Sequence, residues 1–136
     1  MNAGGIRLWY ARAVMALAVV LFGFLAQLYA FTPLDGIDMF GISVSGEAHS
    51  ITFLRTGVGG MFASLFLASL IGLVRPRLFY PCLTFIVGVN AMIVLLRLYG
   101  LAVDGITPTN ISELRDEGIG WLVLFSGWLA CPRNRS

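Results

Sequence analysis

The sequence predicts an all-α integral membrane protein: an antiparallel four-helix bundle that crosses the bilayer up, down, up and down. Two observations predict this fold. The chain of 136 residues is 58% hydrophobic and only 12% charged, whereas a soluble domain carries about 25% charged residues. The apolar residues also gather in runs close to the roughly 20 residues that a helix needs to cross a membrane. At this length we expect a single domain, residues 1–136.

The first predicted span covers residues 11–31, because Ala13 to Phe31 is uncharged and apolar. Thr32-Pro33 should end it, since proline disfavours helical geometry at the preceding residue. A cleaved signal peptide is the competing interpretation, but this run is longer than the about 7–15 apolar residues typical of such peptides. Residues 32–50 mix glycines, acids and apolar side chains. This mixture predicts a first outer loop that lies on the membrane surface, with one helical turn.

The second predicted span covers residues 51–74 and carries Arg55 near its start. Small side chains recur at every fourth position along it, and we expect them to form one row on the helix. In lipid such rows let helix backbones approach closely, because packing rather than the hydrophobic effect drives helix association. The predicted helix-packing residues are Thr56, Gly60, Ser64, Ala68 and Gly72.

The third predicted span covers residues 78–103 and follows a tight connection, Arg75-Pro76-Arg77. Asn90, Arg97 and Asp104 lie at intervals of seven residues, so they share about one face of the helix. A polar stripe on an otherwise apolar helix should face protein or a cavity rather than lipid. Asp104-Gly105 then predicts a turn.

The fourth predicted span covers residues 111–131 and ends before Pro132. Its apolar part begins only at Ile119 and is too short to cross a bilayer alone. The helix must therefore carry several charged residues into the membrane's edge, and its whole length would then be about 30 Å. Asn110 followed by Glu113 resembles a capping box at its start.

Arginines and acids lie on opposite sides of this arrangement. With four spans, the two termini and the second loop share one side and hold six of the nine arginines, while all seven acids fall in or beside the first and third loops. The positive-inside rule then places both termini in the cytoplasm. We therefore expect a multi-pass protein of the cytoplasmic membrane, in contact with membrane lipids.

Charged residues inside the predicted spans should meet at one depth in the outer leaflet. Arg55 lies about 6 Å, and Arg97 about 9 Å, from the outer ends of their helices. Glu113 and Glu117 enter from the same side, and their i,i+4 spacing makes them repel each other unless a cation lies between them. We predict that Arg97 pairs with an acid of the fourth helix, and that Arg55 joins this cluster or faces the outer loop.

This ionic cluster has two interpretations. As a structural feature, its charges neutralise one another and set the helix register. As a site open to the periplasmic side, an arginine not fully used by carboxylates would hold an anion or a lipid head group, with Asn90 at the inner limit of the cavity. The candidate ligand-binding or ionic-cluster residues are Arg55, Asn90, Arg97, Asp104, Glu113 and Glu117.

Motifs of enzymes and metal proteins are missing from the sequence. It contains no glycine-rich phosphate loop and no Ser-His-Asp set. Its one histidine, His49, has no second histidine to form a metal pair, and Cys82 and Cys131 have no redox or metal spacing. We predict no catalytic residue, no metal and no cofactor, and we expect no nucleic-acid partner because no basic patch with interleaved aromatics occurs.

Three stretches resemble a family of small bacterial membrane proteins of unknown function, which have about this length and four predicted helices. The stretches are Arg12 and Pro33 at the ends of the first span, residues 55–60, and residues 97–105 followed by Glu117. The resemblance implies the four-helix fold and a bacterial inner membrane, and it brings no assigned activity. It points to Arg55, Arg97, Asp104 and Glu117 as the positions to test.

The sequence therefore predicts a small non-enzymatic membrane protein, an accessory or scaffold subunit that binds a lipid or apolar ligand near the ionic cluster. Its expected partners are membrane lipids and either a larger membrane protein complex or further copies of itself. One alternative is a small transporter or channel-like protein that uses Arg55, Arg97 and Glu117. Another is a membrane enzyme acting on a lipid-soluble substrate, with an acid of the last helix as the base.

Overall fold

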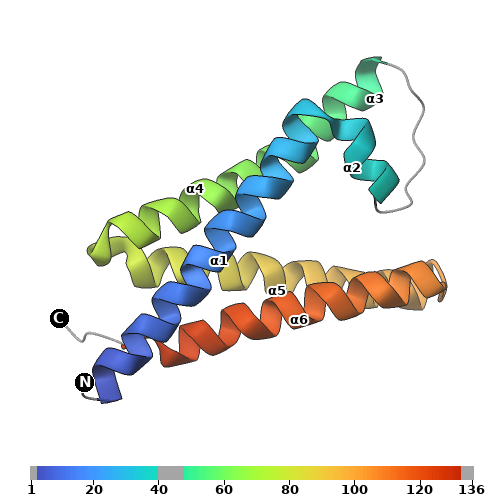
Figure 1. Ribbon diagram of the computed structural model, residues 1–136. Helices are drawn as coiled ribbons and strands as arrows, with labels where there is room; N and C mark the ends of the chain where they lie inside the picture. Colours follow the sequence, from blue (N-terminus) through green and yellow to red (C-terminus); the bar gives the residue numbers. More distant parts are fainter. Residues whose placement is uncertain (1–2, 40–47, 133–136) are drawn as a thin grey trace.

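The computed structural model describes residues 3–39 and 48–132, which are almost entirely helical and contain no strand (Figure 1). This confirms the all-α prediction. In chain order the elements are α1 (Ala3–Phe31), α2 (Pro33–Met39), α3 (Ala48–Phe53), the π-helical turn η1 (Leu54–Gly59), α4 (Gly60–Val74), the 3₁₀ turn η2 (Pro76–Leu78), α5 (Phe79–Val103) and α6 (Pro108–Ala130).

Three helical stretches are long and apolar enough to cross a membrane: Gly4–Phe31, Ala48–Val74 and Pro76–Val103. They correspond to the first three predicted spans, and each begins earlier in the chain than predicted. In the described part of the chain α6 is not among them. Its first turns carry Glu113, Arg115, Asp116 and Glu117, which lower the mean hydropathy of the helix.

Two sequence signals end helices where they were expected to. α1 ends at Phe31, and Pro33 begins α2, a position where the missing N–H of proline costs no helical hydrogen bond. α5 ends at Val103, and Gly105 follows with a φ of 106°. Residues with a Cβ rarely adopt this left-handed conformation, so the glycine is what allows the tight turn into α6.

The start of α6 differs from the prediction. Thr107 caps the helix, because its Oγ1 accepts a hydrogen bond from the backbone N–H of Asn110 at 3.1 Å. The predicted capping box at Asn110 and Glu113 is wrong for two reasons. The helix begins earlier, at Pro108, and the Glu113 carboxylate is bound to Arg97 instead.

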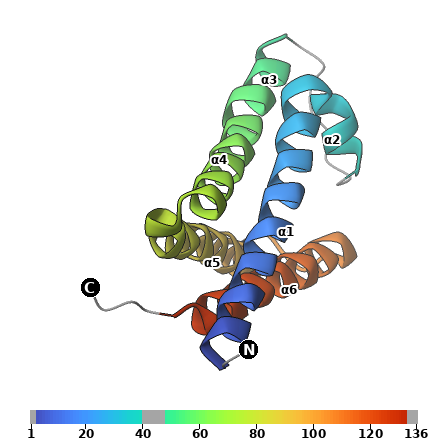
Figure 2. The same ribbon diagram turned by 60° about the vertical axis from the view of Figure 1, so that its left-hand side comes forward.

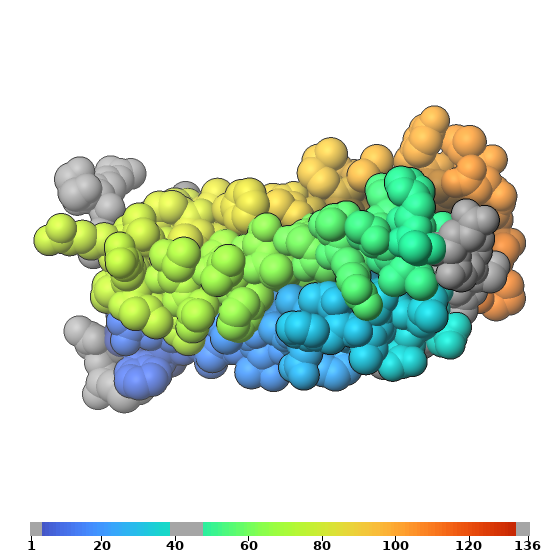
Figure 3. Space-filling view, turned by 90° about the horizontal axis from the view of Figure 1, so that it is seen from above, coloured from blue at the N-terminus to red at the C-terminus, as the bar shows by residue number. Residues whose placement is uncertain are grey.

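The long helices form two pairs. α1 packs along α4 and η1, and α5 packs along α6, while contacts of α1 with α6 and of α4 with α5 join the pairs. Figures 1 and 2 show the pairs close together near the N-terminal end of α1 and diverging toward α2 and the α5–α6 connection. Seen from above, α1 and α4 run side by side along the long axis of the molecule (Figure 3).

The main core lies where the two pairs meet. Met15 of α1, Leu65 of α4, Leu83 and Ile86 of α5 and Leu124 of α6 are buried there. Many large apolar side chains elsewhere on the four long helices are exposed. In a membrane these side chains would contact acyl chains, so their exposure is the expected arrangement for helices that cross lipid.

A smaller core joins α1, α2 and η1 through Tyr29, Ile37 and Leu54. The Tyr29 hydroxyl donates a hydrogen bond to the carbonyl oxygen of Gly36 at 3.4 Å, which holds α2 against α1. The predicted first outer loop therefore contains a helix of 7 residues. The rest of that prediction concerns residues 40–47, which lie outside the described residues, and His49 is exposed in α3.

The predicted row of small residues does not form one packing face. Gly72 is buried in a helix contact, and Ala68 packs against the main core. Thr56 and Ser64 are exposed, and nothing lies within 4 Å of the position of a Cβ on Gly60. Positions four residues apart drift by about 40° per step around a helix with 3.6 residues per turn, so a long row of this kind cannot remain on one face.

The π-helical turn η1 also interrupts the row. Its wider turn changes the angular phase between the residues before and after it. Gly59 becomes the residue of close approach to α1, because a Cβ there would lie 3.3 Å from the backbone nitrogen of Ala30. The predicted packing role therefore falls on Gly59 and Gly72 rather than on the whole row.

Candidate functional site

Arg97 forms ion pairs with two glutamates of α6. Its Nη1 lies 2.6 Å from Glu113 Oε2. Its Nη2 and Nε donate to the two carboxylate oxygens of Glu117 at 2.7 and 3.0 Å. This bidentate geometry, the strongest arrangement of an arginine with a carboxylate, confirms the prediction that Arg97 pairs with an acid of the last helix.

One guanidinium therefore serves both carboxylates. Glu113 and Glu117 lie one helical turn apart and would repel each other on the same face. Arg97 lies between them, and the three side chains remain 31%, 16% and 27% exposed for Arg97, Glu113 and Glu117 respectively. This partial exposure weakens each pair relative to a fully buried one. The cluster fixes the register of α5 against α6, because any axial shift would break one of the pairs.

Arg55 does not join this cluster. It lies in η1, where its side chain is exposed, and within the described residues it forms no ion pair. The helix pair that carries Arg55 diverges from the pair that carries Arg97 (Figure 1), so the two arginines cannot reach the same carboxylates. The alternative, that Arg55 faces the outer loop, concerns residues outside those described.

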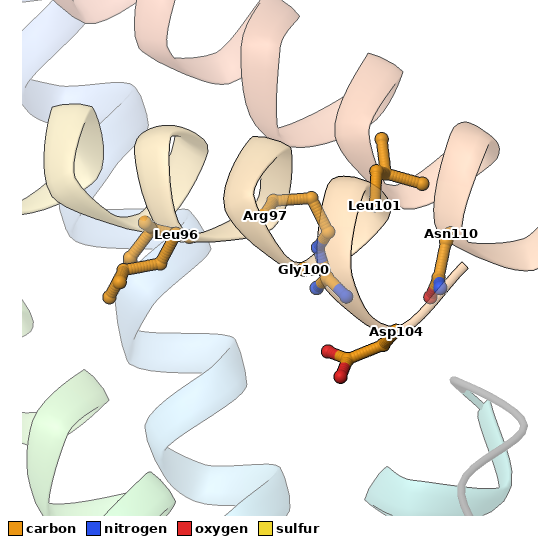
Figure 4. A pocket seen from close by; sticks show the side chains of 7 residues that line it. Leu96, Arg97, Gly100, Leu101, Asp104 and Asn110 are labelled. Carbon is orange, nitrogen blue, oxygen red and sulfur yellow. The ribbon is translucent and has the colours of Figure 1, made fainter. Parts of the chain in front are cut away.

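A hollow of about 360 Å³ lies along α5 beside the ion pairs. Arg97, Asp104 and Asn110 supply its polar lining, and the remainder consists of Ile93, Leu96, Gly100 and Leu101. Figure 4 shows the Arg97, Asp104 and Asn110 side chains along the same edge of α5 and the start of α6. The predicted stripe on α5 thus supplies two of the three polar side chains that line the hollow.

The charge of this region is negative. The region holds three carboxylates, those of Asp104, Glu113 and Glu117, and the single guanidinium of Arg97, a formal surplus of two negative charges. Of the three carboxylates only that of Asp104 belongs to the lining of the hollow. The exposed Asp104 side chain forms no ion pair or hydrogen bond within the described residues. An anion would be repelled here, whereas a cation or a hydrogen-bond donor would be attracted.

Asn90 does not line the hollow. Its Nδ2 donates a hydrogen bond to the carbonyl oxygen of Ile86, one turn earlier in the same helix, at 2.9 Å. The polar group of the Asn90 side chain therefore has a partner within α5. Asn110 was expected only to cap the last helix, yet its side chain lines the hollow.

Trp121 was not expected to belong to a site. Its Nε1 is buried without a hydrogen-bond partner in the described structure, and no signal in the sequence indicates this unpaired donor.

Polar contacts at the other end of the molecule join α1 to α6. Arg7 Nη2 donates to the carbonyl oxygen of Leu129 at 3.1 Å, which satisfies a carbonyl at the C-terminal end of α6. The hydroxyls of Tyr10 and Ser126 are hydrogen-bonded at 2.7 Å. These contacts close the end where the helix pairs converge, so the two pairs are free to diverge only at the end that carries the ionic cluster.

Among the described residues no three His, Cys, Asp or Glu side chains form a group that could hold a metal ion. The chain matches no protein-family model, no curated protein and no solved structure in the comparisons made with each. The resemblance to a family of small bacterial membrane proteins therefore remains an expectation from the sequence.

Proposed function

We propose that the protein is a non-enzymatic membrane protein with four antiparallel spans, which binds an amphipathic ligand in the hollow beside α5 and α6. The observation that carries this proposal is the pairing of an acidic edge, formed by Asp104 and the Arg97 cluster, with apolar walls formed by Leu96 and Leu101. Such a hollow suits a molecule with a cationic or donor head and an apolar chain. Of the natural candidates, lipids with an ammonium head group fit this chemistry best.

The ion pairs support the crossing of α6. The 23 residues of this helix give a length of about 35 Å, enough to span the hydrocarbon core. The charges in its first turns would oppose insertion if they were isolated. Arg97 compensates Glu113 and Glu117, while Arg115 and Asp116 pair with each other at an exposed position. The helix can therefore place these charges at the membrane edge.

The distribution of arginines supports the orientation. Arg7, Arg12, Arg75 and Arg77 lie at the end where the helix pairs converge, and the described acids lie at the other end. We propose that the converging end is cytoplasmic and that the hollow opens toward the outer leaflet. A bacterial inner membrane, and assembly with a larger complex or with further copies of the chain, remain predictions from the sequence.

Binding is better supported than transport. A transport path would need available polar groups inward of the ionic cluster. Ser69 Oγ donates to its own helix at Leu65 O, and Thr84 both accepts from Trp128 Nε1 and donates to Tyr80 O. Both hydroxyls already have protein partners, which argues against a ladder of ligands toward the other end.

Native mass spectrometry of the purified protein with defined lipids tests the proposal. We expect phosphatidylethanolamine to bind in the presence of excess phosphatidylcholine, and Asp104→Asn to weaken this binding by about fivefold or more, which corresponds to a loss of about 1 kcal/mol. Asp116→Asn is the matched control, because its carboxylate pairs with Arg115 outside the hollow. Equal phosphatidylethanolamine binding by the Asp104→Asn and Asp116→Asn variants would contradict the proposal.

A further inference from the structure

A second hollow, of about 450 Å³, lies at the converging end between α1 and the end of α4. Its wall on α1 consists of Trp9, Arg12, Ala13 and Ala16. These positions recur at i, i+3, i+4 and i+7, so they share one helix face. Its other wall consists of Leu73, Val74 and Pro76 from α4 and η2.

Small side chains create this hollow. Ala13 and Ala16 leave space between the helices that larger residues would fill. The chain leaves α4 at this level, because η2 begins at Pro76. Trp9 and Val74 at its rim are 64% and 69% exposed. In a membrane protein such apolar side chains contact lipid, and tryptophan is enriched at the level of the head groups. The hollow therefore opens to the membrane at interface depth.

No carboxylate of a described residue pairs with the arginines at this hollow. Arg12 is half-buried and forms no ion pair with any described residue. Arg75 and Arg77 flank Pro76 and are exposed. Arg7 differs from these three because it is already bound to the Leu129 carbonyl. A half-buried guanidinium without a carboxylate favours an anion, and its planar fork of donors matches the oxygens of a phosphate group.

We propose that an anionic glycerophospholipid binds between α1 and α4, with its phosphate on Arg12 and an acyl chain over Ala13, Ala16 and Leu73. Basic pockets between spanning helices are a recognised chemistry for such lipids. A free phosphate ion would leave the apolar walls unused, so we assign the site to a lipid. The proposal stands apart from the ligand proposed beside α5 and α6, because that hollow lies beside Glu113 and Glu117 at the other end of the molecule.

Quenching of Trp9 fluorescence by brominated lipids tests this proposal. The protein with Trp121→Phe and Trp128→Phe is reconstituted in phosphatidylcholine that contains a minor fraction of brominated phosphatidylglycerol or brominated phosphatidylcholine. We expect the anionic lipid to quench Trp9 more strongly, by a factor of about two or more. If this variant folds poorly, the difference in quenching between the parent protein and Trp9→Phe reports the same quantity.

Two variants then separate the roles of charge and space. Arg12→Gln should remove the preference for the anionic lipid, and Ala16→Leu should remove it by filling the hollow while every charge remains. Arg115→Gln and Ala102→Leu are the matched controls. Both residues are exposed and lie near the α5–α6 connection, far from this hollow, so these variants should keep the preference.

The outcomes decide the proposal. Equal quenching by the two brominated lipids, or a preference that survives Arg12→Gln or Ala16→Leu, overturns it. Loss of the preference on addition of inorganic phosphate overturns the assignment to a lipid. Binding of phosphatidylethanolamine that depends on Asp104 is unaffected by any of these results, so the two proposals fail independently.

Discussion

Arg97 compensates two carboxylates with one side chain, and this makes its loss different from the loss of either glutamate. Removing Glu117 leaves Arg97 paired with Glu113. Removing Arg97 leaves two like charges one turn apart on α6. Leaving a charge without its partner destabilises a protein by more than the intact ion pair stabilises it. Partial exposure to water reduces this loss of stability without removing it.

A double-mutant cycle measures this asymmetry. Arg97→Leu should lower the free energy of unfolding in detergent by about 1–3 kcal/mol, and Glu117→Leu by less. The double variant should be more stable than the sum of the two losses implies, because the removal of Glu117 relieves part of the repulsion that Arg97→Leu creates. Additive losses would contradict the coupling.

Arg115→Leu is the control for this cycle. Arg115 and Asp116 form the other ion pair of α6, but their side chains are 67% and 66% exposed. Water screens such a pair, so its loss should change the stability far less than Arg97→Leu does. A loss of stability as large as that of Arg97→Leu would mean that the loss of any arginine in this region, rather than the loss of its ion pairs, destabilises the protein.

At the scale of helices, close approach is confined to a few glycines. A Cβ at Gly72 would lie 2.8 Å from Cys82 Cβ, and one at Gly127 would lie 2.8 Å from Val14 Cγ1. The first joins α4 to α5 and the second joins α6 to α1. Gly118 and Gly120 of α6 have nothing within 4 Å of such an atom, so only the partner helix distinguishes Gly127 from them.

Gly127→Ala should therefore destabilise the protein by about 1–3 kcal/mol, because the new methyl group forces α6 away from the branched Val14 side chain. Gly120→Ala on the same helix should be neutral or stabilising by up to about 1 kcal/mol, since alanine favours a helix over glycine. Unfolding titrations of both variants in one detergent make the comparison. A similar loss in the two variants would show that glycine flexibility, and not packing, matters.

Across the whole molecule, the two helix pairs converge at one end, and a hollow lies at each end. The hollow beside Arg97 and Asp104 lies in a region with a surplus of carboxylates, and the other lies beside Arg12, Arg75 and Arg77. Oppositely charged ends suit a protein that spans a bilayer, because the cytoplasmic side favours arginine. The proposed orientation follows from this polarity.

Cysteine labelling tests the orientation. In a variant with Cys82→Ala and Cys131→Ala, Thr109→Cys should react with an impermeant maleimide added outside intact cells, and Arg77→Cys should react only after lysis. A fluorescent reporter fused after Ser136 should be active only if it folds in the cytoplasm, because α6 is proposed to return the chain to that side. A reporter on the outer side would mean that only the three apolar stretches cross.

Several features were predictable because they depend on neighbours in the chain. Of the four spans that the apolar runs predicted, three are long apolar helices in the structure. Pro33 predicted a helix end, and Asp104-Gly105 predicted the turn into α6. The pairing of Arg97 was also predictable, since opposite charges at one depth in a bilayer have few other partners.

Other features were decided only when the helices packed together. A regular period cannot reveal the π-helical turn at residues 54–59, nor that Gly59 rather than Gly60 approaches α1. The separation of Arg55 from Arg97 follows from the divergence of the two pairs. The residues that line each hollow come from more than one helix. The local sequence therefore determines where helices form and where charges lie along them, whereas contacts between helices decide which side chains share a site.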